Sequence, residues 1–371
     1  MLKIGITGQG GFIGTNLFNF VGLQEGVERI PFEKKFFQNK QQLQHFVKQC
    51  DVIVHLAALN RHNDAQVVYQ TNIELAKRLI DAMEIVNVRP HVIFSSSTQE
   101  EKDNMYGKSK KECRNLFTRW AEKNQATFTG LVIPNVFGPF GNPYYNSVIA
   151  TFSHQLTHNE TPKIENGGTL KLIYVGELTA GIWKLIKEKL CQPYLLLSPT
   201  SEAKVSEILN LLISYKEKYF ENYTFPTLNN HFELNLFNTF RSYLDQKNHF
   251  PVLLKKNTDN RGSFIESVKT ETGGQFSFST THPGITRGDH FHTRKIERFT
   301  VISGKAVIEL RRIGTNNILH FELDGEKPSF VDIPVWYTHN ITNVGSEELL
   351  TLFWINEFFN PGDPDTYFEK V

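Results

Sequence analysis

Two groups of residues in this sequence have the types and the spacing that chemistry requires, and they lie far apart in the chain. Near the start, a glycine-rich stretch at residues 7–14 is followed about a hundred residues later by Tyr106 and Lys110. Glycines of this kind can bind a dinucleotide, and a phenol beside an ammonium can transfer a proton. The second group has the composition of a metal site: His290, His292, Glu297 and His339.

The glycine-rich stretch predicts a nucleotide-binding turn. Gly8, Gly11 and Gly14 come directly after an apolar run at residues 2–6, which is expected to form a buried strand. Glycines at such a turn let the backbone approach a pyrophosphate closely, and the N–H groups of the following helix point at its negative charge. A tight structural turn is the alternative, but the expected strand-to-helix context favours nucleotide binding.

Tyr106 and Lys110 form a possible proton-transfer pair. Because they are four residues apart, their side chains share one face of a helix. The ammonium is then expected to favour the tyrosinate and to lower the pKa of the phenol, which would make Tyr106 a usable acid. The pair alone is weak evidence, but its position shortly after the expected strand at residues 92–95 makes it informative.

With residues 55–58 and 135–139 as supporting matches, the N-terminal two thirds resembles the extended short-chain dehydrogenase/reductase family, most of whose members act on nucleotide sugars. The resemblance implies that Tyr106 is the general acid and that Lys110 holds the cofactor ribose. It implies that Ser97 binds the substrate oxygen, with Ser96 as the alternative. The cofactor-binding residues that it implies are Gly8, Gly11, Phe12, Ile13, Gly14, Leu56, Ala57 and Lys110.

The identity of the nicotinamide cofactor is less clearly encoded. The second strand, expected at residues 29–32, ends without a clear ribose-binding aspartate and is followed by Glu33, Lys34 and Lys35. The lysines favour NADPH, whereas ordinary surface charges are the alternative. Thr98 and Gln99 stand where related dehydratases carry an Asp-Glu pair, so dehydration is not expected; epimerase and reductase remain open.

The second group predicts a metal site in a β-barrel. His290 and His292 alternate along an expected strand, so both imidazoles point to one face, and Glu297 can reach the same interior. His339 would join them from another strand. Three imidazoles and one carboxylate suit a divalent transition metal, with zinc favoured. For any one of these histidines alone, a satisfied core side chain would be the simpler interpretation.

The spacing of this group resembles both cupin motifs, and a second likeness leaves the role of His290 open. Residues 259–264 and 286–290 resemble segments of metal-free cupins that epimerise 4-keto nucleotide sugars. In those enzymes the histidine at this position is the base, so His290 is a metal ligand or a base. Arg261 and Arg287 could hold a diphosphate or form structural ion pairs. The remaining candidates for the epimerisation acid or base are Tyr337, His282 and Glu266.

Length and patterning predict two domains in these 371 residues. Apolar runs alternating with helical periodicity predict an α/β domain over residues 1–245, a Rossmann-like doubly wound parallel sheet. Short alternating strands predict an all-β cupin barrel over residues 250–371. Lysine plus arginine (40) balance aspartate plus glutamate (39), so neither nucleic acid nor membrane insertion is expected. Three scattered cysteines and the lack of a long apolar run favour the cytoplasm.

Over nearly its whole length, and especially at residues 145–152, 332–340 and 364–368, the chain resembles bifunctional capsular polysaccharide synthesis enzymes, a reductase fused to a zinc cupin. The resemblance implies a homodimer that uses NADPH and Zn²⁺. Its substrate would be a UDP-linked 4-keto-6-deoxy-N-acetylhexosamine, epimerised at C3 in the cupin and reduced at C4. The implied product is UDP-2-acetamido-2,6-dideoxy-L-talose, on the route to UDP-N-acetyl-L-fucosamine.

Two other functions are compatible with the same residues. In the first, the reductase acts alone and the cupin is a scaffold that binds metal and holds the dimer. In the second, a metal-dependent oxygenase of cupin type is fused to a dehydrogenase. The arginine segments that resemble sugar epimerases have no evident role in an oxygenase, and this observation disfavours it.

Overall fold

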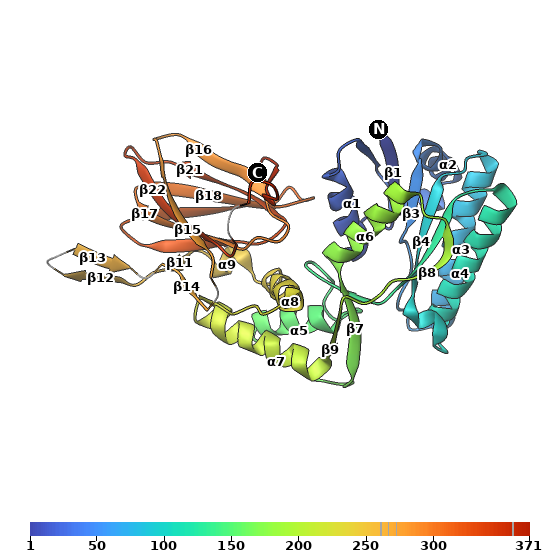
Figure 1. Ribbon diagram of the computed structural model, residues 1–371, viewed down its shortest axis with the longest axis horizontal. Coiled ribbons are helices and arrows are strands. Elements are labelled where there is room, and N and C mark those ends of the chain that lie inside the picture. The colour runs from blue at the N-terminus through green and yellow to red at the C-terminus, as the bar shows by residue number, and fades with distance from the viewer. Residues whose placement is uncertain (260–261, 266, 272, 358–359) are drawn as a thin grey trace. The chain divides into compact units, whose positions relative to one another are not determined.

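The computed structural model describes residues 1–259, 262–265, 267–271, 273–357 and 360–371. The chain forms two compact units, which Figure 1 shows with their elements labelled. The first comprises Met1–Val148 and Asn166–Val205, and the second Ile149–Glu165 and Ser206–Val371. The boundaries of these units differ from those of the expected domains. The expected domain boundary between residues 245 and 250 stays a prediction.

The first unit is built on a parallel six-stranded sheet with the order β2-β1-β3-β4-β5-β8. Its strands are β1 (Leu2–Thr7), β2 (Val27–Ile30), β3 (Val52–His55), β4 (His91–Ser97), β5 (Phe128–Ile133) and β8 (Gln192–Leu196). Every residue of β3 and β5 is buried, because both faces of a parallel sheet are covered. Continuous apolar runs rather than alternating ones therefore encode these strands.

Helices cover both faces of this sheet, as the doubly wound pattern predicted. They are α1 (Phe12–Gly22), α2 (Lys40–Gln49), α3 (Ala65–Ile85), α4 (Met105–Asn124) and α6 (Val175–Glu188). One core gathers around Phe46, Leu79 and Phe117, which come from α2, α3 and α4. The other core contains Leu17 of α1 and Leu178 of α6. Figure 1 shows α1 and α6 together on one side of the sheet.

Several element boundaries differ from expectation. Expected helices at residues 72–86 and 108–123 begin earlier, because Asp64 and Asn104 cap α3 and α4 by accepting backbone N–H groups of the first turn. The second strand ends at Ile30 instead of residue 32, since Pro31 has no N–H to donate to the sheet. The 3₁₀ helices η1 (Lys34–Gln38) and η2 (Thr98–Glu101), and the small sheet β6 (Asn135–Phe137), β7 (Thr169–Tyr174) and β9 (Ser201–Lys204), complete the unit.

The second unit contains the expected β-barrel, formed by two antiparallel five-stranded sheets with the orders β11-β20-β17-β22-β15 and β19-β18-β21-β16-β23. Strand β18 alternates buried and accessible residues, and Ala306, Ile308 and Leu310 point into a core that also holds Val331 and Ile341. The barrel strands are β11 (Val252–Leu253), β15 (Gln275–Thr281), β16 (Thr286–Phe291), β17 (Glu297–Ser303), β18 (Lys305–Arg312), β19 (Ile318–Asp324), β20 (Ser329–Ile333), β21 (Tyr337–Asn343), β22 (Leu349–Ile355) and β23 (Tyr367–Phe368). The predicted fold class, a Rossmann-like sheet followed by a cupin barrel, is confirmed.

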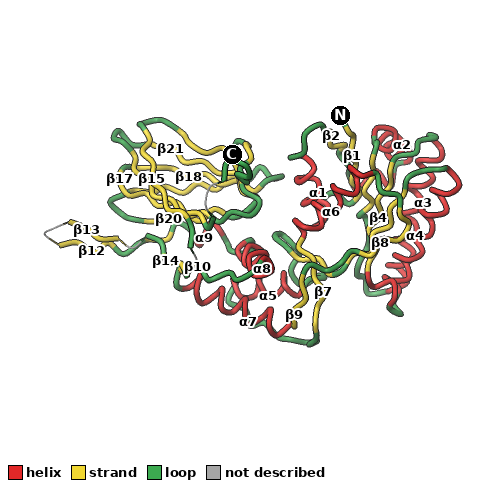
Figure 2. Tube along the Cα trace, in the orientation of Figure 1, coloured by secondary structure: helices red, strands yellow, loops and turns green. Residues whose placement is uncertain are grey.

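Helices and small strands complete this unit, and Figure 2 colours them by type. They are α5 (Val148–Thr157), α7 (Val205–Tyr215), the π-helical η3 (Lys216–Glu221), β10 (Thr224–Phe225), α8 (His231–Arg241), α9 (Gln246–His249), β12 (Lys256–Asp259), β13 (Gly262–Ile265) and β14 (Lys269–Thr270). A buried polar network joins them to the barrel. The guanidinium of Arg298 binds Asp332 with an Nε–Oδ1 distance of 2.7 Å, and the hydroxyl of Tyr219 donates to the same carboxylate. Among the described residues, no helix combines the length and apolar character needed to cross a membrane.

Candidate active site and candidate metal centre

The predicted nucleotide-binding residues lie where the strand order of the sheet reverses, at the carboxyl ends of the neighbouring strands β1 and β3. Ligands of doubly wound sheets bind at such switch points. Gly8 has a φ of +74°, and a Cβ there would lie 2.8 Å from the nitrogen of Ala57. A Cβ on Gly14 would overlap the carbonyl oxygen of Gly8. Both glycines are therefore required by the close approach of the backbone.

The other predicted cofactor residues gather around this turn. Helix α1 begins at Phe12 with Gly11 as its N-cap, so its first N–H groups face the space beyond β1. After β3, the nitrogen of Leu56 donates to the carbonyl of Thr7 at 3.1 Å. The Thr7 hydroxyl also contacts Nδ1 of His55 at 2.6 Å, and burial lowers the pKa of this histidine to about 3. One region at the ends of β1 and β3 thus contains Gly8, Gly11, Phe12, Ile13, Gly14, Leu56 and Ala57. Their role in cofactor binding stays a prediction.

Tyr106 and Lys110 share one face of α4, as their spacing predicted. The Nζ atom of Lys110 lies 5.7 Å from the centre of the Tyr106 ring. The same atom donates to the carbonyl of Ser95 at 2.8 Å, which anchors this part of α4 to the end of β4. Lys110 is only 3% exposed, so this hydrogen bond forms away from water.

The expected lowering of the Tyr106 pKa is wrong for this structure. Burial raises the pKa of Tyr106 to about 12, and the neighbouring Tyr145 acts in the same direction. Burial also lowers the pKa of Lys110 to about 8. Withdrawal from water is therefore the largest influence on the pKa of both side chains. As a result, Tyr106 keeps its proton at neutral pH, which suits a proton donor.

Ser96 and Ser97 differ in what their hydroxyl groups bind. Ser96 is buried and donates to the carboxylate of Glu100, which pairs with Arg114 at 2.9 Å. Ser97 is half-buried, and its oxygen accepts the backbone N–H of Gln99 at 3.2 Å. The proton of the Ser96 hydroxyl is thus committed to Glu100, whereas Ser97 can donate its own proton to another acceptor. This difference favours Ser97 as the substrate-binding serine.

Sequence reasoning missed three polar side chains that hold this region together. Glu100 and Arg114 connect η2 to α4, although they are 14 residues apart. Asn72 of α3 donates to the hydroxyl of Ser109 at 2.9 Å and exchanges hydrogen bonds with the backbone of Leu59. No motif marks these residues, because each acts on a partner that is distant in sequence.

The cofactor-selecting lysines lie at η1, directly after β2. Lys35 forms an ion pair with Glu33 at 2.7 Å, and both side chains are exposed. This pairing offsets part of the positive charge expected to attract NADPH. A preference for NADPH therefore stays a prediction that depends chiefly on Lys34.

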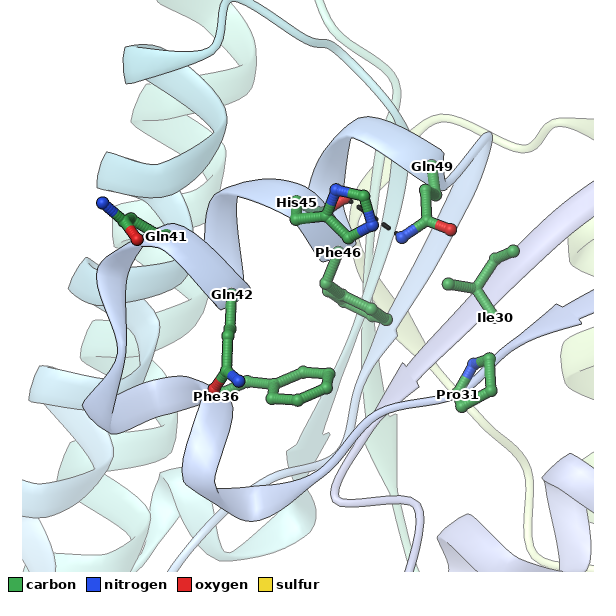
Figure 3. A pocket seen from close by; sticks show the side chains of 8 residues that line it. All are labelled: Ile30, Pro31, Phe36, Gln41, Gln42, His45, Phe46 and Gln49. Atoms are coloured by element: carbon green, nitrogen blue, oxygen red, sulfur yellow. Dashed lines mark hydrogen bonds between the residues drawn. The ribbon is translucent and has the colours of Figure 1, made fainter.

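The predicted catalytic and cofactor residues do not line the hollow drawn in Figure 3. This hollow of about 350 Å³ is formed by β2, η1 and α2. Its apolar wall contains Phe36 and Phe46, and Gln49 beside it donates to the carbonyl of His45 at 3.2 Å. The hollow is therefore not the predicted catalytic or cofactor-binding site.

The second predicted site is assembled in the barrel from three strands and one turn. The donor atoms of His290, His292, Glu297 and His339 all lie within 4.8 Å of one another. His290 and His339 are register partners in β16 and β21, and Glu297 begins β17. The expectation that one strand carries both His290 and His292 is partly wrong, since β16 ends at Phe291 and the chain then turns.

These side chains fit a bound cation. Nδ1 of His292 contacts the carbonyl of Asp365 at 2.5 Å, and Nδ1 of His339 contacts that of Tyr337 at 3.5 Å. A hydrogen on each Nδ1 leaves lone pairs on the two Nε2 atoms, which lie 2.9 Å and 3.3 Å from the same oxygen of Glu297. Buried lone pairs that face a carboxylate need a positive charge between them. The N₃O donor set suits Zn²⁺.

The charge states of Glu297 and His290 agree with this fit, whereas Glu297 raises the pKa of His292 against the effect of burial. Burial opposes a charge on Glu297, but the imidazoles of His292 and His339 hold the pKa of its carboxyl group well below the ordinary value. Burial and the two neighbouring histidines lower the pKa of His290 to about 4. At neutral pH Glu297 is therefore a carboxylate and His290 a neutral imidazole, the forms that bind metals.

The remaining predicted residues have varied positions. Tyr337 is two residues from His339 on β21, so both side chains point to the same face of the strand. His282 is largely exposed and lies 3.9 Å from Glu348. Arg287 is exposed on β16. Arg261 and Glu266 lie outside the described residues.

Comparisons with known proteins cover both parts of the chain. Residues 4–193 match the NAD dependent epimerase/dehydratase family, and residues 257–367 match the polysaccharide biosynthesis C-terminal domain. A UDP-2-acetamido-2,6-beta-L-arabino-hexul-4-ose reductase from Pseudomonas aeruginosa is 32% identical over 368 residues, covering 99% of this chain and 98% of the relative.

Solved structures extend this similarity. The capsular polysaccharide assembling protein CapF from Staphylococcus aureus aligns with a TM-score of 0.62 and 36% identity, covering 100% of both chains. The NADPH complex of RMD from Pseudomonas aeruginosa has a TM-score of 0.53 and 17% identity over 58% of this chain and 83% of RMD, a likeness of fold alone. The chain therefore belongs to the NAD dependent epimerase/dehydratase family and, within it, to the CapF group, in which that domain is joined to a polysaccharide biosynthesis C-terminal domain.

Proposed function

We propose that this protein is a bifunctional nucleotide-sugar enzyme that acts on a UDP-linked 4-keto-6-deoxy-N-acetylhexosamine. The cupin barrel epimerises C3, and the Rossmann-like unit reduces the C4 ketone with NADPH. The product is UDP-2-acetamido-2,6-dideoxy-L-talose, on the route to UDP-N-acetyl-L-fucosamine. A homodimer, as the family resemblance implies, is part of the same proposal.

One observation carries the reductase assignment. The chain matches a named UDP-hexulose reductase along almost its full length, and it places Tyr106 and Lys110 on one face of α4 beside the end of β4. Bound NADPH would supply the hydride for C4. Tyr106 holds a proton on its hydroxyl oxygen at neutral pH and donates it to the developing alkoxide. Ser97 orients the substrate oxygen, and Lys110 supplies positive charge.

The cupin assignment depends on the acidity of the proton at C3, since a neighbouring ketone stabilises the enolate that forms when this proton leaves. Neutral His290 can accept this proton only if it does not ligate the metal, and Tyr337 is a candidate for returning one to the opposite face. A bound Zn²⁺ would supply positive charge for the enolate. The donor set His290, His292, Glu297 and His339 supports this metal.

Substitution of the proposed acid tests whether the two activities are separate. Tyr106→Phe should abolish NADPH oxidation, because the alkoxide at C4 then has no proton donor. It should leave deuterium incorporation at C3 intact when the UDP-4-keto sugar is incubated in heavy water. Mass spectrometry of the sugar and absorbance at 340 nm measure the two processes.

Tyr223→Phe, a partly exposed tyrosine of the second unit, is the matched control and should change neither process. Simultaneous loss of exchange and oxidation in Tyr106→Phe would contradict separate sites. Absence of C3 exchange in the wild-type protein would instead support the alternative in which the cupin is only a metal-binding scaffold.

A further inference from the structure

The C-terminal segment at residues 363–369, here named the C-terminal strap, lies against the strand and turn that carry the metal-ligand candidates. Strand β23 within the strap pairs with β16, so that Phe368 is the register partner of His290 and Tyr367 that of Phe291. The nitrogen of Glu369 donates to the carbonyl of Asp289 at 2.9 Å. The strap thus continues the sheet beside the candidate metal centre.

Asp365 is the residue of the strap that makes the most polar contacts with the turn between β16 and β17. It is 2% exposed, and its two carboxylate oxygens accept four hydrogen bonds from residues 293–295. One oxygen accepts the nitrogen of Thr293 at 3.1 Å and its hydroxyl at 2.7 Å. The other accepts the nitrogens of Arg294 at 2.9 Å and Lys295 at 3.0 Å.

This turn separates His292 from Glu297, so its conformation sets the distance between two of the candidate ligands. A carboxylate that gathers three successive backbone N–H groups holds such a turn in one shape. The ammonium of Lys295 also donates to the carbonyl of Pro364, which adds a further contact between the turn and the strap. The carboxylate of Asp365 is therefore well placed to keep Glu297 opposite His292.

The backbone of Asp365 also acts directly on one imidazole. Its carbonyl oxygen lies 2.5 Å from Nδ1 of His292, and Nε2 of that ring faces Glu297 at 2.9 Å. A carbonyl bound to Nδ1 fixes the hydrogen there and leaves Nε2 as the metal-binding atom. Asp365 has a φ of +42°, a left-handed conformation, and its carbonyl and its carboxylate contact the adjacent residues His292 and Thr293.

We propose that Asp365 is a positioning residue of the metal centre, which sets the tautomer of His292 and the separation of His292 and Glu297. This inference rests on the proposed Zn²⁺ site. It adds that the affinity of this site for metal depends on the C-terminal strap. Partners that orient a ligand in this way commonly contribute 10- to 100-fold to metal affinity.

Asp365→Asn provides the sharpest test, because asparagine tolerates a positive φ but replaces one accepting oxygen by an amide that cannot accept. Asp363→Asn is the matched control, since it removes an equal charge from the same strap at an exposed ion pair with Arg294. Zn²⁺ affinity of the full chains would be measured by competition with a chromogenic chelator. Asp365→Asn should bind Zn²⁺ about 10- to 100-fold more weakly, and Asp363→Asn should match the wild type.

A second measurement separates positioning from general support of the fold. With Co²⁺ in place of Zn²⁺, the visible absorption bands report the geometry of the ligands. These bands should change in Asp365→Asn and not in Asp363→Asn. If Asp365→Asn does not fold, Thr293→Val removes one hydrogen bond to the same carboxylate and should give a smaller shift in the same direction.

Each outcome bears on a defined claim. Wild-type protein that binds no Zn²⁺ would overturn the proposed metal centre and this inference together. Wild-type protein that binds Zn²⁺, with Asp365→Asn retaining both its affinity and its Co²⁺ spectrum, would overturn only the role of Asp365.

Discussion

At the scale of single residues, the proposed reductase site depends on two groups whose pKa values are shifted away from each other by burial. Burial raises the pKa of the Tyr106 hydroxyl to about 12 and lowers that of the Lys110 ammonium to about 8. In both cases water is lost around the form that carries charge. At neutral pH the pair therefore consists of a protonated phenol and a cationic lysine, and only the lysine titrates near physiological pH.

This difference predicts the pH dependence of ketone reduction. As pH rises through about 8, Lys110 loses its proton, and the positive charge that favours the developing alkoxide and the cofactor is lost. The kcat/KM for the keto sugar should therefore fall on the alkaline side of about pH 8, by up to tenfold per pH unit. Tyr106 should contribute no titration below about pH 11, because its pKa is about 12.

Initial rates of NADPH oxidation between pH 6 and 10, in buffers of constant ionic strength, would measure this profile. Lys110→Met should lower kcat/KM at pH 7 by about 100-fold and should lack the alkaline decline. The exposed Lys108→Met on the same helix is the control and should keep the wild-type profile. A decline that persists in Lys110→Met would assign the titrating group to another residue.

The residues predicted from sequence share one property: their partners are near in the chain or belong to a known motif. Gly8 and Gly14 belong to one turn, and Tyr106 and Lys110 are one helical turn apart. The contact between Asp365 and His292 spans 73 residues. An aspartate that binds backbone N–H groups has no sequence signature, because its partners can have any side chain. Such positioning residues emerge only from the folded chain.

At the scale of elements, the proposed reductase site depends on how η2 packs against the first turn of α4. Only eight residues separate Ser97 from Tyr106, and this short connection is held at both ends. Asn104 caps α4 by accepting the nitrogen of Gly107 at 2.7 Å, and Glu100 pairs with Arg114 further along the helix. Because the connection is short and held at both ends, the packing of η2 on α4 sets the distance between Ser97 and Tyr106.

Gly107 is the point of closest approach in this junction. A Cβ at Gly107 would overlap the carbonyl oxygen of Gln99, whereas a Cβ at Gly181 of α6 would meet no atom within 4 Å. Gly107→Ala should therefore lower stability by about 1–3 kcal/mol and reduce the rate of NADPH oxidation. Gly181→Ala should raise stability by up to about 1 kcal/mol and leave the rate unchanged, since alanine favours the helix.

Thermal unfolding of both variants, together with their rates of NADPH oxidation, would measure these effects. The shared Gly→Ala change isolates the close contact with Gln99 from the ordinary helix preference. Equal stabilisation by both substitutions, with full activity in Gly107→Ala, would show that η2 can move away without cost.

Elements were predictable where burial follows a regular pattern. The alternation in β18 and the continuous apolar run of β3 each identify a strand, because one is covered on a single face and the other on both. The helix starts were less predictable, since Asp64 and Asn104 lie outside the apolar pattern. The buried pairing of Arg298 with Asp332 could not be foreseen, because the two lie on different strands and charged residues are ordinarily exposed.

At the scale of the whole molecule, each compact unit carries one of the two predicted sites. The nucleotide-binding turn and Tyr106 belong to the first unit, and the metal-ligand candidates belong to the second. One ketone at C4 would serve both, because it acidifies the proton at C3 and accepts hydride itself. The two proposed reactions would therefore need different side chains, and removal of one set should leave the other chemistry measurable.

Removal of the metal tests this independence from the side opposite to Tyr106. Protein treated with a chelator should lose deuterium exchange at C3, because the enolate then lacks a positive charge beside it. Glu297→Gln should have the same effect, because it removes the one carboxylate among the four candidate ligands. Reduction of a 4-keto sugar that already has the final configuration at C3 should keep its wild-type rate.

Glu309→Gln, a carboxylate on β18 paired with His320, is the control and should retain exchange. Restoration of exchange by added Zn²⁺ in the chelated wild type, but not in Glu297→Gln, would place the requirement at this cluster. Loss of reduction along with exchange would mean that the barrel supports the catalysis of the other unit, and the proposal of two independent chemistries would fail.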